Sequence, residues 1–136
     1  MDRPLSEEQI SALLEEARAR RANAYAAYSG FSVGACVLAG GRVYSGVNVE
    51  NASYPLSMCA ERNAVAAAIA AGENAIAAVA IVGGGRAPAP PCGGCRQVLS
   101  EFGAGATVVA ESDGGERRRW TVEELLPSPF EASALE

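Results

Sequence analysis

The chain has 136 residues, with four cysteines, eleven arginines and neither histidine nor lysine. Without histidine there is no Ser–His or Cys–His catalytic pair and no imidazole metal ligand, and without lysine there is no Schiff base. A proton shuttle must therefore be Asp, Glu, Tyr or Cys, and a soft-metal site must be built from thiolates.

Size and composition indicate one globular domain over residues 1–136, with 49% hydrophobic and 20% charged residues. The net charge of −5 argues against a nucleic-acid partner, since phosphate binding needs clustered cations. The one basic run, Arg117–Arg119, is best read as a solvated edge. No stretch is long and apolar enough to span a membrane, and the N-terminus lacks the apolar core of a secretory signal. We therefore expect a cytoplasmic protein whose thiols stay reduced.

Helices and strands alternate along the predicted chain. Ser6–Gln9 reads as a capping box that opens a helix running to about Tyr25. Glycines 40 and 41 then predict the turn of an antiparallel hairpin. The hairpin strands and the later elements are expected, in chain order, as strands over Phe31–Leu38 and Arg42–Val49, a helix over Cys59–Ala71, a strand over Ala75–Val82, a helix over Cys92–Phe102, strands over Ala106–Ala110 and Arg117–Trp120, and a short helix opened by a second capping box, Thr121–Glu124.

This order predicts the α/β class, as a single three-layer α/β/α domain with a five-stranded mixed sheet. Two consecutive strand–helix–strand crossovers favour parallel central pairs, with helices on both faces of the sheet. The short turn before the last strand favours an antiparallel final pair.

Three cysteines stand at the starts of two predicted helices. Cys59 opens one helix, and Cys92 and Cys95 open the next. Both helix starts are expected at the same sheet edge, where open α/β sheets bind ligands. Helix N-termini favour anions, so three thiolates can stay deprotonated there and gather round one zinc ion per subunit.

Three protein ligands leave the fourth tetrahedral position of zinc open for water, as in catalytic sites. Three thiolates also leave a net negative charge, which Arg62 and Arg96 are placed to offset by donating hydrogen bonds to sulfur. For Arg96 the alternative is a bond to a helix carbonyl or a neighbouring carboxylate. Glu61 lies two residues from a ligand, within reach of the water's proton, and is the candidate general acid/base. The fourth cysteine, Cys36, falls within a predicted strand and is expected to be a buried free thiol.

The segments Cys59-Ala-Glu61-Arg62 and Pro91-Cys-Gly-Gly-Cys95 resemble the signature of the zinc-dependent nucleoside and nucleobase deaminases. The version with three cysteines is similar to the small homotetrameric cytidine deaminases. The likeness covers nearly the whole chain, with matching segments at residues 24–35, 46–54, 91–102 and 125–130.

The resemblance implies roles for four further residues around the substrate. Asn48 and Glu50 match the pair that binds the ribose 3′-hydroxyl, and their spacing of two in a strand places both on one face. Phe31 matches the aromatic residue that packs on the pyrimidine. The backbone of Ala60 matches the amide that contacts the ring carbonyl.

The resemblance also implies a homotetramer with shared active sites. Tyr54 and Phe130 match residues that reach a neighbouring subunit's site, although on sequence alone both could be ordinary apolar residues. Ser32 and Ala27 stand where the family usually has proline, which affects loop rigidity and not the chemistry.

We therefore expect a zinc hydrolase that deaminates cytidine and 2′-deoxycytidine to the uridine nucleosides and ammonia, in pyrimidine salvage. Three alternatives remain at this point. An aminonucleoside deaminase of the blasticidin S type shares both motifs, and Asn48 with Glu50 favours the nucleoside instead. A zinc-stabilised binding module without catalysis would not need Glu61 as a general acid/base beside the metal ligands. A deaminase acting on polynucleotides would need a basic groove, which the net charge of −5 disfavours.

Overall fold

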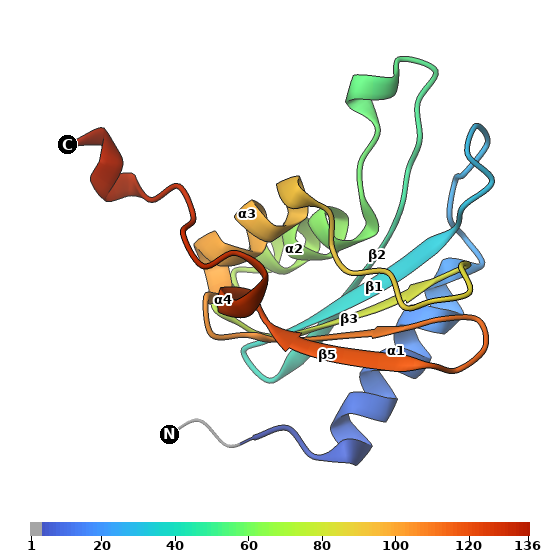
Figure 1. Ribbon diagram of the computed structural model, residues 1–136, viewed down its shortest axis with the longest axis horizontal. Coiled ribbons are helices and arrows are strands. Elements are labelled where there is room, and N and C mark those ends of the chain that lie inside the picture. The colour runs from blue at the N-terminus through green and yellow to red at the C-terminus, as the bar shows by residue number, and fades with distance from the viewer. Residues whose placement is uncertain (1–3) are drawn as a thin grey trace.

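The computed structural model describes residues 4–136 as a mixed sheet with helices on both faces (Figure 1). The helices are α1 (Glu7–Arg21), α2 (Ala60–Ala70), α3 (Gly93–Gly103) and α4 (Val122–Leu125), with 3₁₀ turns η1 (Tyr54–Leu56) and η2 (Ala132–Leu135). The strands are β1 (Val33–Ala39), β2 (Arg42–Val47), β3 (Ile76–Gly83), β4 (Thr107–Glu111) and β5 (Arg117–Thr121). The predicted order of elements and the α/β class are confirmed, with boundaries that move by a few residues.

Both predicted capping boxes are present. The Ser6 side chain accepts a hydrogen bond from the Gln9 amide and the Gln9 side chain accepts one from the Ser6 amide. Thr121 and Glu124 make the same reciprocal pair at the start of α4. These bonds satisfy amides that have no partner within the helix, which explains why the starts were readable from sequence.

The sheet order is β2-β1-β3-β4-β5, and it corrects one expectation. Among the five strands within residues 4–136, β3 and β4 are the one parallel pair, because β1 lies between β2 and β3 and runs antiparallel to both. The β2–α2–β3 crossover therefore joins strands that point the same way without pairing. The final pair of β4 and β5 is antiparallel, as predicted.

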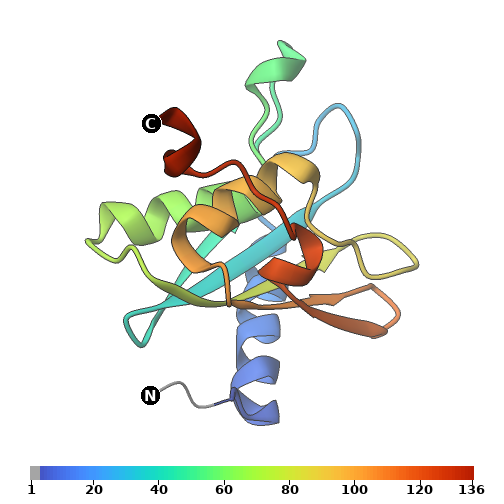
Figure 2. The same ribbon diagram turned by 60° about the vertical axis from the view of Figure 1, so that its left-hand side comes forward.

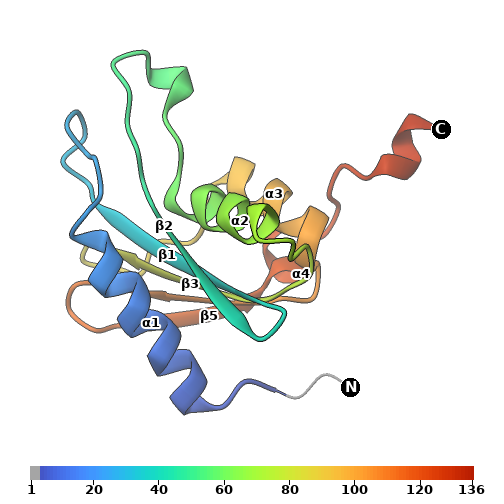
Figure 3. The ribbon, with the colours of Figure 1, turned by 180° about the vertical axis from the view of Figure 1, so that it is seen from behind.

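Two apolar clusters lie on opposite faces of the sheet, and the strands contribute side chains to both. Helix α1 covers one face of the sheet with Ile10, Leu13, Leu14 and Ala17. Helices α2 and α3 cover the other face, as Figures 2 and 3 show from two sides. No helix among the described residues is long and apolar enough to cross a membrane.

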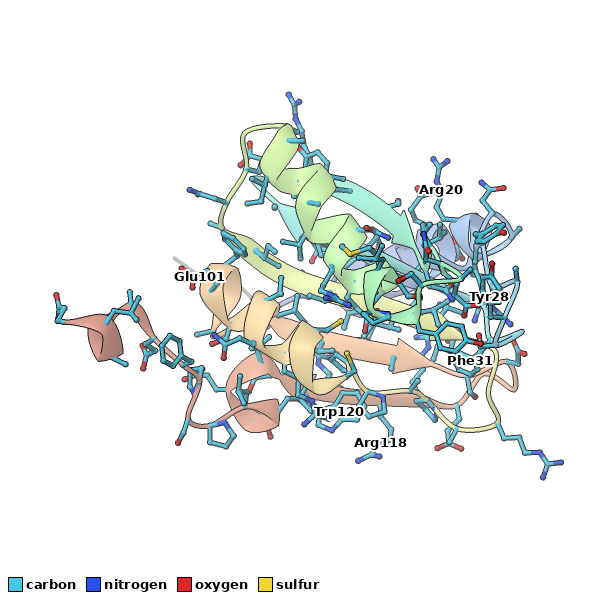
Figure 4. The ribbon with its side chains drawn as sticks, turned by 90° about the horizontal axis from the view of Figure 1, so that it is seen from above. Arg20, Tyr28, Phe31, Glu101, Arg118 and Trp120 are labelled. Carbon is cyan, nitrogen blue, oxygen red and sulfur yellow. The ribbon has the colours of Figure 1, made fainter. Side chains whose placement is uncertain are left out.

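The basic run Arg117–Arg119 forms most of the edge strand β5, and all three arginines are exposed. The Arg118 guanidinium lies 4.8 Å from the centre of the Trp120 ring on the same strand (Figure 4). The expectation of a solvated edge is confirmed, and charge on an edge strand discourages pairing with another sheet.

Helix α2 approaches β2 closely at Gly46. A Cβ atom there would lie 2.4 Å from the Ala64 amide nitrogen and 2.5 Å from the Ala60 carbonyl oxygen. Only glycine allows the first turns of α2 to rest directly on β2, and those turns carry Cys59 and Glu61.

Replacing Gly46 by alanine is expected to destabilise the protein by about 3 kcal/mol, because the clash is with backbone atoms that cannot rotate away. Urea unfolding of the two proteins measures the difference. Gly114→Ala is the matched control, since its Cβ would meet nothing closer than 3.9 Å. Equal stability of the Gly46→Ala protein and the wild type would show that α2 can shift without cost.

Candidate metal centre and active site

The topology brings the three cysteines to one edge of the sheet. Cys59 is the N-cap residue of α2, Cys92 is the N-cap residue of α3, and Cys95 lies in the first turn of α3. Strands β2 and β3 point the same way, so the helices that follow them begin at the same end of the molecule (Figure 4). The positive ends of two helix dipoles therefore face the same three sulfur atoms.

The spacing of the sulfur atoms fits zinc. The Sγ atoms of Cys59 and Cys92 are 3.8 Å apart, those of Cys92 and Cys95 are 3.5 Å apart, and all three lie within 4.8 Å of one another. Zn–S bonds of ~2.3 Å at tetrahedral angles place sulfur atoms ~3.8 Å apart. Three thiolates at this spacing could hold one zinc ion as three of its four tetrahedral ligands.

Arg62 supplies positive charge at the cluster. Its Nη2 donates to the Cys59 Sγ atom at 3.5 Å, while its Nε is buried without a hydrogen-bond partner among the described residues. The pKa of the Cys59 thiol is lowered to about 5, first by a hydrogen bond from Cys95 and then, against the opposing effect of burial, by Arg62. Cys59 is therefore ready to bind metal as a thiolate at neutral pH.

Arg96 does not serve the cluster as expected. Its Nε donates to the Pro91 carbonyl at 2.8 Å and its Nη1 donates to the Leu125 carbonyl at 2.9 Å. The expectation that Arg96 bonds to the thiolates is wrong, because the side chain turns toward the end of α4 and ties it to the start of α3. The helix dipoles and Arg62 are left to offset the thiolate charge.

Glu61 lies in the first turn of α2 with only 6% of its surface exposed. Burial raises the pKa of this carboxyl group to about 7, and the nearby Cys59 charge adds to the rise. A carboxyl group with a pKa near neutrality can both take and return a proton, which is what general acid/base catalysis needs.

Asn48 and Glu50 follow β2 on the same side of the chain, but both side chains are engaged with the segment before β1. The Asn48 amide bridges the Val33 amide and the Phe31 carbonyl, with both bonds at 2.8 Å. One Glu50 oxygen accepts hydrogen bonds from the Tyr28 and Ser29 amides at 2.9 Å each, and the other accepts from the Ser29 hydroxyl.

A cavity of about 300 Å³ opens beside Glu50, lined by Tyr28, Ser29, Glu50, Tyr54 and Ser57. The hydrogen bond from the Ser29 hydroxyl, followed by those from the backbone, holds the pKa of Glu50 below its usual range. The carboxylate is therefore charged at neutral pH and can accept a further hydrogen bond from a hydroxyl group in the cavity.

Ala60 directly follows Cys59 in the sequence, and Phe31 lies in the segment before β1. The Phe31 ring rests on the backbone after β3, where it approaches the Cβ positions of Gly83 and Gly85 to 3.3 and 3.5 Å. Figure 4 shows this ring at the end of the molecule where α2 and α3 begin. Ala60 is fully buried as the first residue of α2, so its amide has no partner within the helix.

Tyr54 and Phe130 stand on segments that project from the body of the chain (Figures 1 and 3). Tyr54 is 69% exposed and meets the Tyr28 ring edge-on, with ring centres 5.9 Å apart. Phe130 is 61% exposed, and its backbone is held by Gln97 through hydrogen bonds of 2.8 and 3.0 Å.

Two partners at this site were not found from the sequence. Gln97 anchors the C-terminal segment at Phe130, 33 residues away, and the Ser29 hydroxyl fixes Glu50 across 21 residues. No local pattern signals such contacts, because they depend on how distant segments fold together.

Cys36 is a buried free thiol, as predicted. Its Sγ donates to the Leu13 carbonyl at 2.9 Å under α1, on the opposite face of the sheet from α2 and α3. Burial raises the pKa of this thiol to about 12. Cys36 is therefore no fourth ligand, and the part of the chain that the structure describes offers no fourth cysteine for a closed structural zinc site.

The chain is similar to known deaminases over most of its length. Residues 7–111 match the family model described as the cytidine and deoxycytidylate deaminase zinc-binding region. A cytidine deaminase of Halalkalibacterium halodurans is 44% identical over 125 residues, covering 90% of this chain and 95% of that protein. One from Sporosarcina psychrophila is 39% identical over 128 residues, covering 93% and 94%.

A solved structure agrees with these sequence matches. The crystal structure of cytidine deaminase from Burkholderia pseudomallei superimposes with a TM-score of 0.86 at 45% identity, covering 93% of this chain and 100% of that one.

Proposed function

This chain belongs to the cytidine and deoxycytidylate deaminase zinc-binding family, and from that membership we propose that it converts cytidine and water to uridine and ammonia with one zinc ion per subunit. We further propose that 2′-deoxycytidine is a second substrate and that the activity serves pyrimidine salvage. The observation that carries the proposal is the set of three sulfur atoms at tetrahedral spacing, with the buried Glu61 two residues from one of them.

In this proposal each residue of the site has a defined role in the reaction. Cys59, Cys92 and Cys95 hold the metal, which when bound supplies Lewis-acid activation of water. Glu61 takes a proton from the attacking water, delivers it to ring nitrogen 3 of the pyrimidine, and carries a second proton to the departing amine. Arg62 stabilises the Cys59 thiolate through its hydrogen bond of 3.5 Å. No proton passes through Arg62.

Four residues bind and orient the nucleoside in this proposal. The Phe31 ring packs on the pyrimidine and the Ala60 amide binds the ring carbonyl. Asn48 and Glu50 bind the ribose 3′-hydroxyl, which cytidine and 2′-deoxycytidine share. The charged Glu50 carboxylate beside a cavity of about 300 Å³ supports this assignment.

We also propose a homotetramer in which Tyr54 and Phe130 complete a neighbour's site. Both rings are exposed on projecting segments, and the neighbouring Leu56 is 65% exposed as well. Large apolar side chains on such segments are stabilised when a partner covers them. Sedimentation analysis of the wild type and of Tyr54→Ala tests the assembly, and a monomeric wild type would contradict it.

The cell compartment proposed is the cytoplasm. All four cysteines are free in the fold, and the three ligands must be reduced to bind zinc, a state that the cytoplasm maintains.

The direct test measures zinc content and conversion of cytidine to uridine on one purified sample. We expect one zinc ion per chain and release of ammonia. Blasticidin S and a cytidine-containing oligonucleotide belong in the same panel, because turnover of either in place of cytidine would identify a different deaminase. Bound zinc without turnover of any substrate would favour a binding module.

A further inference from the structure

The guanidinium group of Arg21 joins three segments that are far apart in the sequence. Arg21 is the last residue of α1, and its Nε donates to the Ser32 carbonyl at 3.1 Å. Its two terminal nitrogens form a fork on the carboxylate of Asp113, in the turn between β4 and β5, with Nη2–Oδ2 at 3.4 Å. A Cβ atom on Gly84 would lie 2.6 Å from Nη2. The end of α1, the segment after β3 and the β4–β5 turn lie together in Figures 1 and 3.

Each of these contacts of Arg21 affects the position of Phe31. Ser32 follows Phe31 directly, so the bond to its carbonyl fixes the backbone from which the ring projects. Gly83 and Gly85 flank the point where the guanidinium rests and form the surface under the ring. Asp113 is bound to that surface too, because its amide donates to the Gly85 carbonyl at 3.4 Å.

The ion pair between Arg21 and Asp113 is partly exposed to solvent, Asp113 more than Arg21. The Arg21 side chain is 23% exposed and the Asp113 side chain is 53% exposed. An exposed ion pair contributes little to stability, so stability alone does not explain this arrangement. The Arg21 guanidinium binds the Ser32 carbonyl through Nε and the Asp113 carboxylate through its two terminal nitrogens. Because the guanidinium is planar and rigid, these bonds fix the distance between the two segments, which the single ammonium group of a lysine could not do.

We propose that Arg21 and Asp113 are positioning residues for Phe31, which hold its ring over the glycine surface at the geometry that binds the pyrimidine. This inference rests on the proposed function, in which Phe31 contacts the base. Arg21 acts on substrate binding through Phe31 and takes no part in proton transfer.

The test compares Arg21→Gln with Arg20→Gln in cytidine kinetics. Arg20 is the neighbouring residue of α1, and its side chain is 55% exposed and ion-paired with Glu16 of the same helix at 2.8 Å. We expect Arg21→Gln to raise KM by about 3- to 10-fold, the factor that one hydrogen bond of ordinary net strength is worth. The kcat value stays within about twofold, since only binding geometry changes. Arg20→Gln leaves both parameters unchanged.

A double-mutant cycle with Phe31→Ala separates positioning from a general effect on the fold. In the Phe31→Ala background, Arg21→Gln is expected to change KM no further, because the ring through which it acts is gone. Asp113→Asn is the milder variant for the case that Arg21→Gln does not fold. It keeps the shape of the turn, and it is expected to raise KM by about twofold, again only when Phe31 is present.

Three results would overturn the inference while leaving the proposed function intact. These are equal KM values for the Arg21→Gln and Arg20→Gln proteins, an undiminished effect in the Phe31→Ala background, or a fall in kcat at constant KM. A wild-type protein that releases no ammonia from cytidine would instead overturn the proposed function, and the inference with it.

Discussion

Replacing Glu61 by glutamine is expected to lower kcat for cytidine by at least ~10²–10⁴-fold while zinc content stays at the wild-type level. Glutamine keeps the size of the side chain and its place in the first turn of α2, but it can neither accept nor return a proton. Steady-state kinetics and metal analysis of the same preparation measure the two quantities.

The matched control for this experiment is Glu101→Gln. Glu101 lies on α3 far from the start of that helix and is exposed (Figure 4). The same chemical change there is expected to leave turnover and zinc content unaltered. Turnover by Glu61→Gln near the wild-type rate, with zinc bound, would remove Glu61 from the proton relay and require another acid/base.

The second large effect is expected for Cys92→Ala, which removes one of the three proposed sulfur ligands. Zinc affinity is expected to fall by more than the ~10–100-fold that loss of a merely supporting residue costs, and activity with it. Cys92 is exposed at the N-cap of α3, so the truncation opens no cavity in the core. Metal analysis after dialysis, together with unfolding curves, distinguishes lost ligation from a lost fold.

Cys36→Ala is the matched control, because it also removes one thiol from the chain but outside the cysteine cluster. Cys36 is buried under α1 and does not belong to the cluster, so this variant is expected to keep its zinc and its activity. Its stability falls by about 1 kcal/mol, because the bond to the Leu13 carbonyl is lost. A Cys92→Ala protein that retains one zinc ion per chain would refute the assignment of Cys92 as a ligand.

The local features of the fold were readable from the sequence because short-range interactions determine them. The capping boxes at Ser6 and Thr121 and the glycines at 40 and 41 set the ends of elements through contacts among adjacent residues. The apolar residues Ile10, Leu13, Leu14 and Ala17 recur at helical spacing and form the buried face of α1. For the same reason the predicted boundaries differ from the observed ones by only a few residues at most elements.

The neighbours in the sheet were predicted less well. Each crossover was expected to join adjacent parallel strands, but β1 inserts between β2 and β3 and pairs with both. The order of helices and strands along the chain does not determine which strands pair, since pairing depends on how the apolar side chains of all three layers are buried together. The consequence for the site is small, because β2 and β3 still point the same way.

The partners of single side chains were the hardest part. Arg96 was expected at the thiolates, from its place beside Cys95, and instead binds the carbonyl of Leu125, 29 residues away. A long, flexible side chain has several acceptors within reach, and sequence adjacency does not choose among them. The same holds for Arg21, whose bonds to Ser32 and Asp113 cross 11 and 92 residues.

The sequence by itself determined which chemistry is available. Four cysteines without histidine leave thiolates as the soft metal ligands, and the places of three of them at helix starts, with Glu61 near Cys59, indicate the candidate donor set and the candidate acid/base. The tertiary structure decided the rest. It brought the sulfur atoms within 4.8 Å of one another, buried Glu61, separated Cys36 from the cluster, and turned Arg96 away from it. Residue types fix what a group can do, whereas distance and burial come only from long-range packing.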